Sequence, residues 1–72
     1  MKSRIRELRH RYGISQTELA EAVGTTRQTI ISIEAERFTT SLPTAYKISH
    51  FFALTIEEVF DFSEIDRELW EE

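Results

Sequence analysis

The stretch QTELAEAVGTTRQTIISIE, residues 16–34, holds two short helical patterns separated by a glycine. Apolar residues recur at helical spacing on both sides of the break, at Leu19, Ala20, Val23, Ile30 and Ile33. Gly24 lies at the break, where it can adopt the positive φ of a tight turn, and Ala20 is small enough for a close helix crossing. The stretch therefore predicts two helices that share one small core.

The second of these helices has a polar first turn. Thr25 and Gln28 have the spacing of a capping box, which predicts that the helix starts directly after Thr25. Its exposed positions are then Thr26, Arg27, Gln28 and Thr29. In a DNA major groove, Arg can donate twice to guanine, Gln can pair with adenine and a Thr methyl can touch thymine. The pattern favours a helix-turn-helix unit that reads bases, and the alternative is an ordinary solvated helix face.

The composition excludes several classes of protein. A chain of 72 residues is long enough for one domain, and without Cys it has neither disulfides nor a thiolate metal site. It has no long apolar run, so we expect no signal peptide, no membrane span and a cytoplasmic, nucleoid-associated location. Its His residues do not cluster with carboxylates and it lacks a glycine-rich phosphate loop, so we expect no metal, no cofactor and no enzyme activity.

The net charge of −4 conceals an uneven distribution of charged residues. Residues 1–37 contain seven Lys and Arg against five Glu, which gives +2. Residues 38–72 contain one Lys and one Arg against eight acids, which gives −6. The basic half holds the helix-turn-helix pattern, and this distribution is expected of a protein that turns one face to DNA phosphates.

A basic amphipathic helix is predicted over residues 2–12, with Ile5 and Leu8 along its inner side and Tyr12 as a further candidate for that side. Gly13 is expected to end this helix in a left-handed conformation. Its outer side carries two candidates for DNA phosphate contact, Arg9 and Arg11, whose alternative role is ordinary solvated charge.

Ser15 and Glu18 form another capping box, so the next helix is predicted to run from Gln16 to about Val23. Gln16 lies in its first turn, where the free N–H groups and the helix dipole attract anions, and it is therefore a further candidate for phosphate contact. Arg37, at or beyond the end of the third helix, is a candidate of the same kind, and we expect Phe38 to pack back on the core.

Two more helices are predicted after residue 40. Ser41 caps the first of them, and Pro43 is tolerated in its first turn. The inner stripe of this fourth helix is Leu42, Ala45, Ile48, Ser49 and Phe52. Thr55 and Glu58 then form the capping box of a short fifth helix.

Residues 62–72 form an acidic tail that still contains an apolar stripe. Such a stripe covers the protein's own core, pairs with a second subunit, or belongs to a frayed terminus. Two aromatic residues of the fourth helix that are not needed for its inner side, Tyr46 and Phe51, could join a contact between subunits. The candidates for dimerisation are Tyr46, Phe51, Phe62, Ile65, Leu69 and Trp70.

Taken together, these residues resemble the Xre family, the helix-turn-helix domain of lambda-type phage repressors and Cro proteins. The resemblance covers nearly the whole chain. It rests on IRELR at 5–9, ISQTELA at 14–20, TRQTI at 26–30, Ile33-Glu34, Ser41-Leu42, Lys47-Ile48 and IEEVF at 56–60.

The resemblance implies an all-α, compact five-helix lambda-repressor-like domain over residues 1–61, with the motif at 16–34. The tail, 62–72, would be a dimerisation segment that forms an extra helix or a short strand. The second helix of the motif would lie in the major groove of double-stranded DNA. The residues carried over for reading bases are Thr26, Arg27, Gln28, Thr29 and Ser32, and those for holding phosphates are Gln16, Arg37 and Thr39.

The chain departs from the family pattern at two places. Ala35-Glu36 stands where many members have Asn-Gly, which removes the residue that takes a left-handed turn. Thr39-Thr40 stands where Asn-Pro is usual, so a phosphate contact from an Asn side chain is weakened to what Thr offers.

The function implied is that of a transcriptional regulator, a repressor more often than an activator, that binds a palindromic operator as a homodimer. The alternative is an antitoxin or anti-repressor, in which the acidic tail and the surplus aromatic residues bind a partner protein and DNA binding is secondary or lost.

Overall fold

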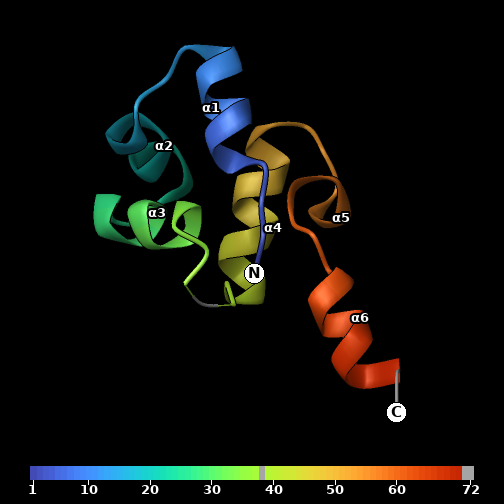
Figure 1. Cartoon of the computed structure of the whole chain (residues 1–72). Coiled ribbons are helices and arrows are strands. Elements are labelled where there is room, and N and C mark those ends of the chain that lie inside the picture. Colours follow the sequence, from blue (N-terminus) through green and yellow to red (C-terminus); the bar gives the residue numbers. More distant parts are fainter. Residues whose placement is uncertain (38, 71–72) are drawn as a thin grey trace.

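The computed structural model describes residues 1–37 and 39–70, and within them the chain forms six helices (Figure 1). They are α1 (Ile5–Tyr12), α2 (Gln16–Val23), α3 (Arg27–Glu34), α4 (Leu42–Phe51), α5 (Ile56–Val59) and α6 (Ser63–Trp70). The predicted all-α class is confirmed, and so is the extra helix in the tail. The expected packing of Phe38 lies outside the described residues.

The helices α1, α2, α3, α4 and α5 enclose a single apolar core. Each of them contributes fully buried side chains, among them Ile5, Leu19, Ile30, Ile48 and Val59. Phe52 and Phe60, each just beyond a helix end, add the two largest of these side chains. Burying a side chain of this size contributes about 1.5–3 kcal/mol, so a small set of well-buried residues can hold a chain of this length.

The helix boundaries around the motif follow from local signals in the sequence. Ser15 caps α2 through a complete capping box with Glu18, and Thr55 does the same for α5 with Glu58, as predicted. Gly13 and Gly24 end α1 and α2 at φ values of 69° and 71°, in the left-handed region. Each glycine therefore turns the chain sharply into the next helix.

The structure confirms the predicted inner side of α4 at all positions but one. Ala45, Ile48, Ser49 and Phe52 are buried, whereas Leu42 is 71% exposed. Leu42 is the first residue of the helix, so it extends past the end of the core. The expectation for Leu42 was therefore wrong.

The first residues form an extended segment in place of the predicted first turn of helix. The backbone N–H of Arg4 donates to Val59 O at 2.8 Å, and that of Asp61 donates to Lys2 O at 2.9 Å. These bonds form an isolated antiparallel bridge between Ser3 and Phe60. The prediction that α1 begins at residue 2 was thus wrong, because residues 2–4 pair with the chain that leaves α5.

α6 projects beyond the rest of the protein, which gives the molecule a long axis of 41 Å against 22 and 19 Å for the others (Figure 1). None of its residues is buried, although Phe62, just before it, packs partly against the core. In the part of the chain that the structure describes, no helix combines the length and the apolar character needed to cross a membrane.

Candidate nucleic-acid interface

α2 and α3 form the two helices of the predicted motif and pack against each other around Gly24. α3 starts one residue later than predicted. Thr26, not Thr25, is its N-cap: the Thr26 hydroxyl oxygen accepts from the backbone N–H of Thr29 at 3.1 Å. The Thr25–Gln28 capping box was therefore wrong, because Thr25 still belongs to the turn that leaves α2, where its N–H donates to Ala20 O.

The outer side of α3 presents the side chains that were predicted to read bases. Arg27 and Gln28 are exposed in the first turn, and Thr29 and Ser32 are half-buried beside them. Gln28 Nε2 lies 3.4 Å from Ser32 Oγ, one turn along the same side. Arg27 makes no hydrogen bond or ion pair with the described residues, so its guanidinium is available to an outside acceptor.

Thr26 is less available than the residues that follow it. Its hydroxyl already caps α3 and lies 2.9 Å from Thr29 Oγ1. A base contact from Thr26 would compete with this cap, which is worth about 1 kcal/mol to a helix.

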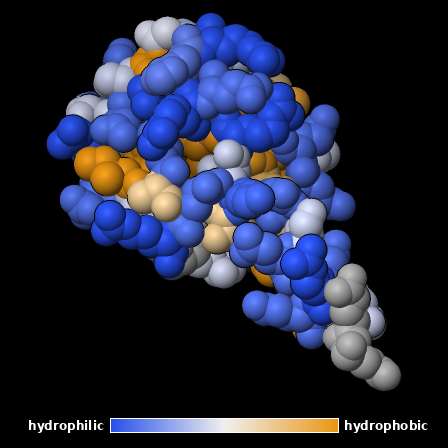
Figure 2. All heavy atoms as spheres, viewed as in Figure 1, coloured by the Kyte–Doolittle hydropathy of each residue, from blue (hydrophilic) through white to orange (hydrophobic). Residues whose placement is uncertain are grey.

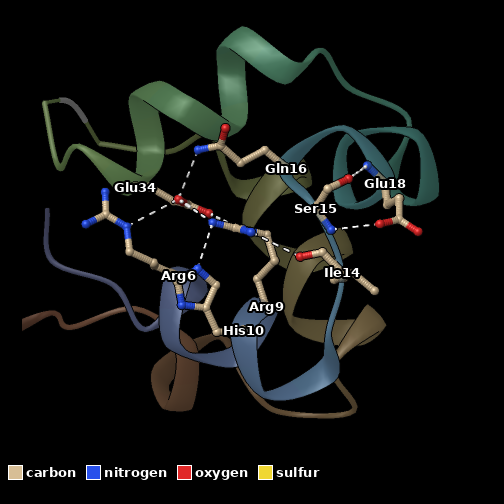
Figure 3. A network of polar contacts seen from close by, with 8 residues as sticks. All are labelled: Arg6, Arg9, His10, Ile14, Ser15, Gln16, Glu18 and Glu34. Carbon is tan, nitrogen blue, oxygen red and sulfur yellow. Dashed lines mark hydrogen bonds and ion pairs between the residues drawn. The ribbon is translucent and has the colours of Figure 1, made fainter.

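Glu34, at the end of α3, joins three helices through one buried carboxylate (Figure 3). Arg9 of α1 donates to it from Nε at 2.8 Å and from a terminal nitrogen at 3.3 Å. Gln16 of α2 donates from Nε2 at 3.2 Å, and Arg6 of α1 from Nε at 3.5 Å. This carboxylate thus fixes the end of α3 relative to the first turn of α2.

The ionisation of Glu34 is set by two opposing effects. Burial of the carboxylate acts to raise its pKa, and the hydrogen bonds from Arg9, Gln16 and Arg6 act to lower it. The bonds prevail, so the pKa of Glu34 lies below its ordinary value of 4.5. Glu34 is therefore ionised, and its contacts are formed, at neutral pH.

The structure gives Arg9 an internal partner in place of the predicted phosphate. Its side chain is only 10% exposed, and a terminal nitrogen also donates to Ile14 O at 3.0 Å. A side chain held in this way cannot reach DNA without breaking the buried pair. Arg9 therefore positions the end of α3 through Glu34.

Gln16 remains suited to a phosphate contact. Its amide carries two N–H donors, of which one is directed at Glu34 Oε1. It lies in the first turn of α2, where the helix dipole favours an anion. The bond to Glu34 orders the side chain at this position before any ligand arrives.

The other predicted phosphate contacts are exposed. Arg11 is on the surface of α1 and forms an ion pair with Glu7 at 3.1 Å, so a phosphate would have to compete with that carboxylate. Arg37 and Thr39 are exposed on the segment that follows α3.

A left-handed turn follows α3, at one of the two places where the sequence departs from the family pattern. Glu36 adopts φ 61°, although it has a side chain where many family members have Gly. Its Oε2 accepts from the backbone N–H of Ser3 at 3.1 Å, which ties this turn to the N-terminal segment. The chain therefore keeps a left-handed turn without the usual glycine, and the Glu36 carboxylate has a partner within the protein.

The predicted dimerisation residues fall on three separate surfaces. Phe62 is half-buried against the core and Ile65 is half-buried, whereas Leu69 and Trp70 are exposed near the end of α6. Tyr46 lies on the outer side of α4 and stacks on His50, with ring centroids 5.7 Å apart. Phe51 follows Tyr46 by five residues, about 140° around the helix, so these two aromatic residues do not share a face.

Sequence patterns missed two features of this region. The role of Glu34 in joining α1, α2 and α3 depends on partners up to 28 residues away, and no local signal marks them. The Ser3–Glu36 contact spans 33 residues and requires an unfavourable backbone conformation at Glu36. Both are products of the tertiary fold.

Comparison with known proteins gives a family and several relatives. The model of a family described as helix-turn-helix matches residues 5–59. A protein of Archaeoglobus fulgidus, named an HTH-type transcriptional regulator, is 47% identical over 70 residues, which are 97% of each chain. The HTH-type transcriptional regulator YgzD of Bacillus subtilis is 47% identical over 60 residues, 83% of this chain and 91% of its own. One of Methanocaldococcus jannaschii is 40% identical over the same shares.

Proposed function

The chain belongs to the helix-turn-helix family, in agreement with the resemblance seen in its sequence, and on this premise we propose that it is a DNA-binding transcriptional regulator. Its relatives carry the name of HTH-type transcriptional regulators, and the family is one of DNA-binding proteins and not of enzymes. The observation that carries the proposal is α3, which combines a buried inner side with exposed Arg27 and Gln28 in its first turn.

In this proposal α3 enters the major groove with its N-terminal turn foremost. Arg27 donates to guanine, Gln28 pairs with adenine, and Thr29 and Ser32 contact the neighbouring bases. Thr26 contributes mainly by capping the helix. Gln16, Arg11, Arg37 and Thr39 hold the phosphates on either side.

The protein binds as a homodimer, and its operator is a palindrome. Two copies related by a twofold axis place their α3 helices in successive major grooves, so the half-sites are roughly one helical turn, about 34 Å, apart. A protein bound in this way excludes other proteins from the same stretch of DNA, which favours repression over activation.

Selection of bound sites from a random pool of double-stranded DNA tests this function. We expect enrichment of a palindrome whose half-sites are separated by about one helical turn, and binding that weakens as salt is raised. Absence of any salt-dependent binding to DNA at low ionic strength, together with a partner protein that co-purifies, would instead favour the antitoxin or anti-repressor alternative.

A further inference from the structure

Two apolar surfaces of this chain have no partner within it. Among the described residues, six large hydrophobic side chains are exposed, and five of them lie on α4 and α6. Leu42 and Tyr46 are 71% and 59% exposed, and Leu69 and Trp70 are 65% and 78% exposed. Apolar groups gathered in this way on a small protein usually mark a surface that contacts another molecule.

The surface on α4 is a continuous stripe. Leu42, Tyr46 and His50 follow one another at intervals of four residues, so they lie within about 80° of one another around the helix. Tyr46 and His50 stack with their rings nearly parallel, at an interplanar angle of 12°. The stripe is therefore an ordered, partly aromatic face.

The helix α6 projects from the rest of the protein (Figures 1 and 2), and Leu69 and Trp70 lie near its end. Phe62, just before the helix, packs partly against the core, and Ile65 is half-buried. Leu69 and Trp70 are mostly exposed, although Leu69 also lines the groove between α6 and the N-terminal segment. A helix of eight residues is marginal in water unless its apolar side is packed. A partner on this end would supply the missing packing.

The charges of the two helices are complementary. α4 contains Lys47 and no Asp or Glu, and Lys47 follows Tyr46 directly. α6 contains three acids, Glu64, Asp66 and Glu68, against one cation, Arg67, so it keeps a net negative charge close to Leu69. Pairing α6 with a second α6 would bring these carboxylates together, whereas pairing it with α4 offsets them with Lys47.

We propose that two copies of this chain exchange their C-terminal helices, so that Leu69 and Trp70 of each copy pack on the Leu42–Tyr46–His50 stripe of the other. The arrangement is symmetric, because each copy gives one α6 and receives one. This inference rests on the homodimer of the proposed function and adds the surfaces through which the copies join.

The exposed side chains of the two helices give an estimate of the size of the contact. A buried aromatic side chain contributes about 150–250 Å², and each copy supplies two aromatic residues and two leucines. The whole interface is then on the order of 1,000 Å², at the lower limit of specific interfaces. Interfaces of this size are typical of weak or transient complexes, so we expect a measurable equilibrium between monomer and dimer.

Two double variants separate this arrangement from its rivals. One is Leu42→Ser with Tyr46→Ser, and the other is Leu69→Ser with Trp70→Ser. Sedimentation equilibrium without DNA measures the dissociation constant of the dimer, and thermal melting checks that each variant is folded, which the exposure of all four side chains leads us to expect. Phe51→Ser, on the other side of α4, is the matched control and leaves the dissociation constant unchanged.

Each double variant alone loses both reciprocal contacts, and its dissociation constant rises about 100-fold. An equimolar mixture of the two recovers one intact contact, so it associates about tenfold more tightly than either variant alone. Pairing of α6 with α6 predicts the opposite: the α4 variant dimerises normally and mixing restores nothing. An unchanged dissociation constant in every variant would mean that α6 packs only on its own chain. Pairing of α6 with α6, or an unchanged constant, would overturn the proposal.

Charge reversal gives a second measurement. Lys47→Glu and Glu68→Lys each weaken the dimer about fivefold, and the two together restore it to near the starting affinity. If α6 pairs with α6, Glu68→Lys alone strengthens the dimer. Binding of a DNA half-site by the monomeric double variants is measured in parallel. Failure to bind it would contradict the proposed function, whereas sedimentation alone decides between the arrangements.

Discussion

Glu34 shows how much of the protein depends on one side chain. Its side chain is fully buried, and Arg9 opposite is 10% exposed. Glu34→Gln leaves the Arg9 charge buried without a counter-charge, so we expect a loss of about 3 kcal/mol in the free energy of unfolding. Urea denaturation measures this loss.

The matched control is Glu7→Gln, since Glu7 pairs with Arg4 and Arg11 on the surface of the same helix. Exposed pairs of this kind contribute less than about 1 kcal/mol. Equal effects of the two substitutions would contradict a special role for the buried carboxylate.

Glu34 also makes the free energy of unfolding depend on pH in the acidic range. Because its pKa is lowered on folding, the stabilisation is fully present above the ordinary value of 4.5 and is lost as the pH falls through the lower, folded value. Glu34→Gln should therefore unfold with a shallower dependence on pH below about 4.5 than the parent protein. Denaturation midpoints between pH 3 and pH 7 measure this, and parallel curves would contradict it.

At the scale of the residue, sequence patterns predicted the sides of the helices and missed the pairing of distant residues. Arg27 and Gln28 could be placed on the surface because they follow a helix start and precede the apolar Ile30 and Ile33. Arg9 could not be placed, since a buried arginine is recognisable only when its partner is known, and Glu34 lies 25 residues further along the chain.

At the scale of the element, the end of α4 carries an unfavourable backbone conformation. Ala53 adopts φ 58°, and its N–H and that of Leu54 donate to the last turn of the helix. Left-handed φ costs a residue with a side chain about 1–2 kcal/mol, and Ala53 is exposed, so its methyl group contributes no packing. We expect Ala53→Gly to raise the free energy of unfolding by about 0.5–1 kcal/mol.

Ala22→Gly is the matched control for this substitution. Ala22 is also exposed, but it lies within α2, where glycine costs about 1 kcal/mol. Thermal or urea denaturation should therefore give changes of opposite sign. Two changes of the same sign would show that backbone conformation does not decide the outcome.

Most elements could be predicted because their signals are local. The Ser15–Glu18 and Thr55–Glu58 boxes and the glycine caps all lie within a few residues of the boundaries that they set. The N-terminal segment was mistaken for helix because its pairing with Phe60 is made across the whole chain. The left-handed conformations of Glu36 and Ala53 were missed for a related reason. The tertiary fold imposes them on residues whose side chains disfavour a positive φ.

At the scale of the whole molecule, the division of charge decides how an acidic protein can bind DNA. The net charge is −4, yet residues 1–37 carry a surplus of positive charge and residues 38–72 carry the acids. Binding to DNA should weaken as salt increases, in spite of the overall charge, because the counterions released come from the phosphates that the basic half contacts.

Arg37→Ala tests the phosphate-binding side of this surface. Arg37 is exposed and lies beyond the end of α3, and we propose that it contacts the DNA backbone and not the bases. We expect weaker binding to every DNA sequence alike and a slope against log salt that is smaller by about one for each Arg37 removed. Titrations of one DNA duplex at several salt concentrations give this slope, and an unchanged slope would exclude the contact.

The most direct measurement is a titration of Arg27→Ala against two labelled duplexes, one carrying the selected palindrome and one of random sequence, at two salt concentrations. If α3 reads bases, Arg27→Ala costs on the order of 1–3 kcal/mol on the selected duplex, little on the random one, and relaxes the preference at one base position. Arg37→Ala, measured beside it, weakens both duplexes equally. Equal losses for both variants on both duplexes would contradict base reading by α3.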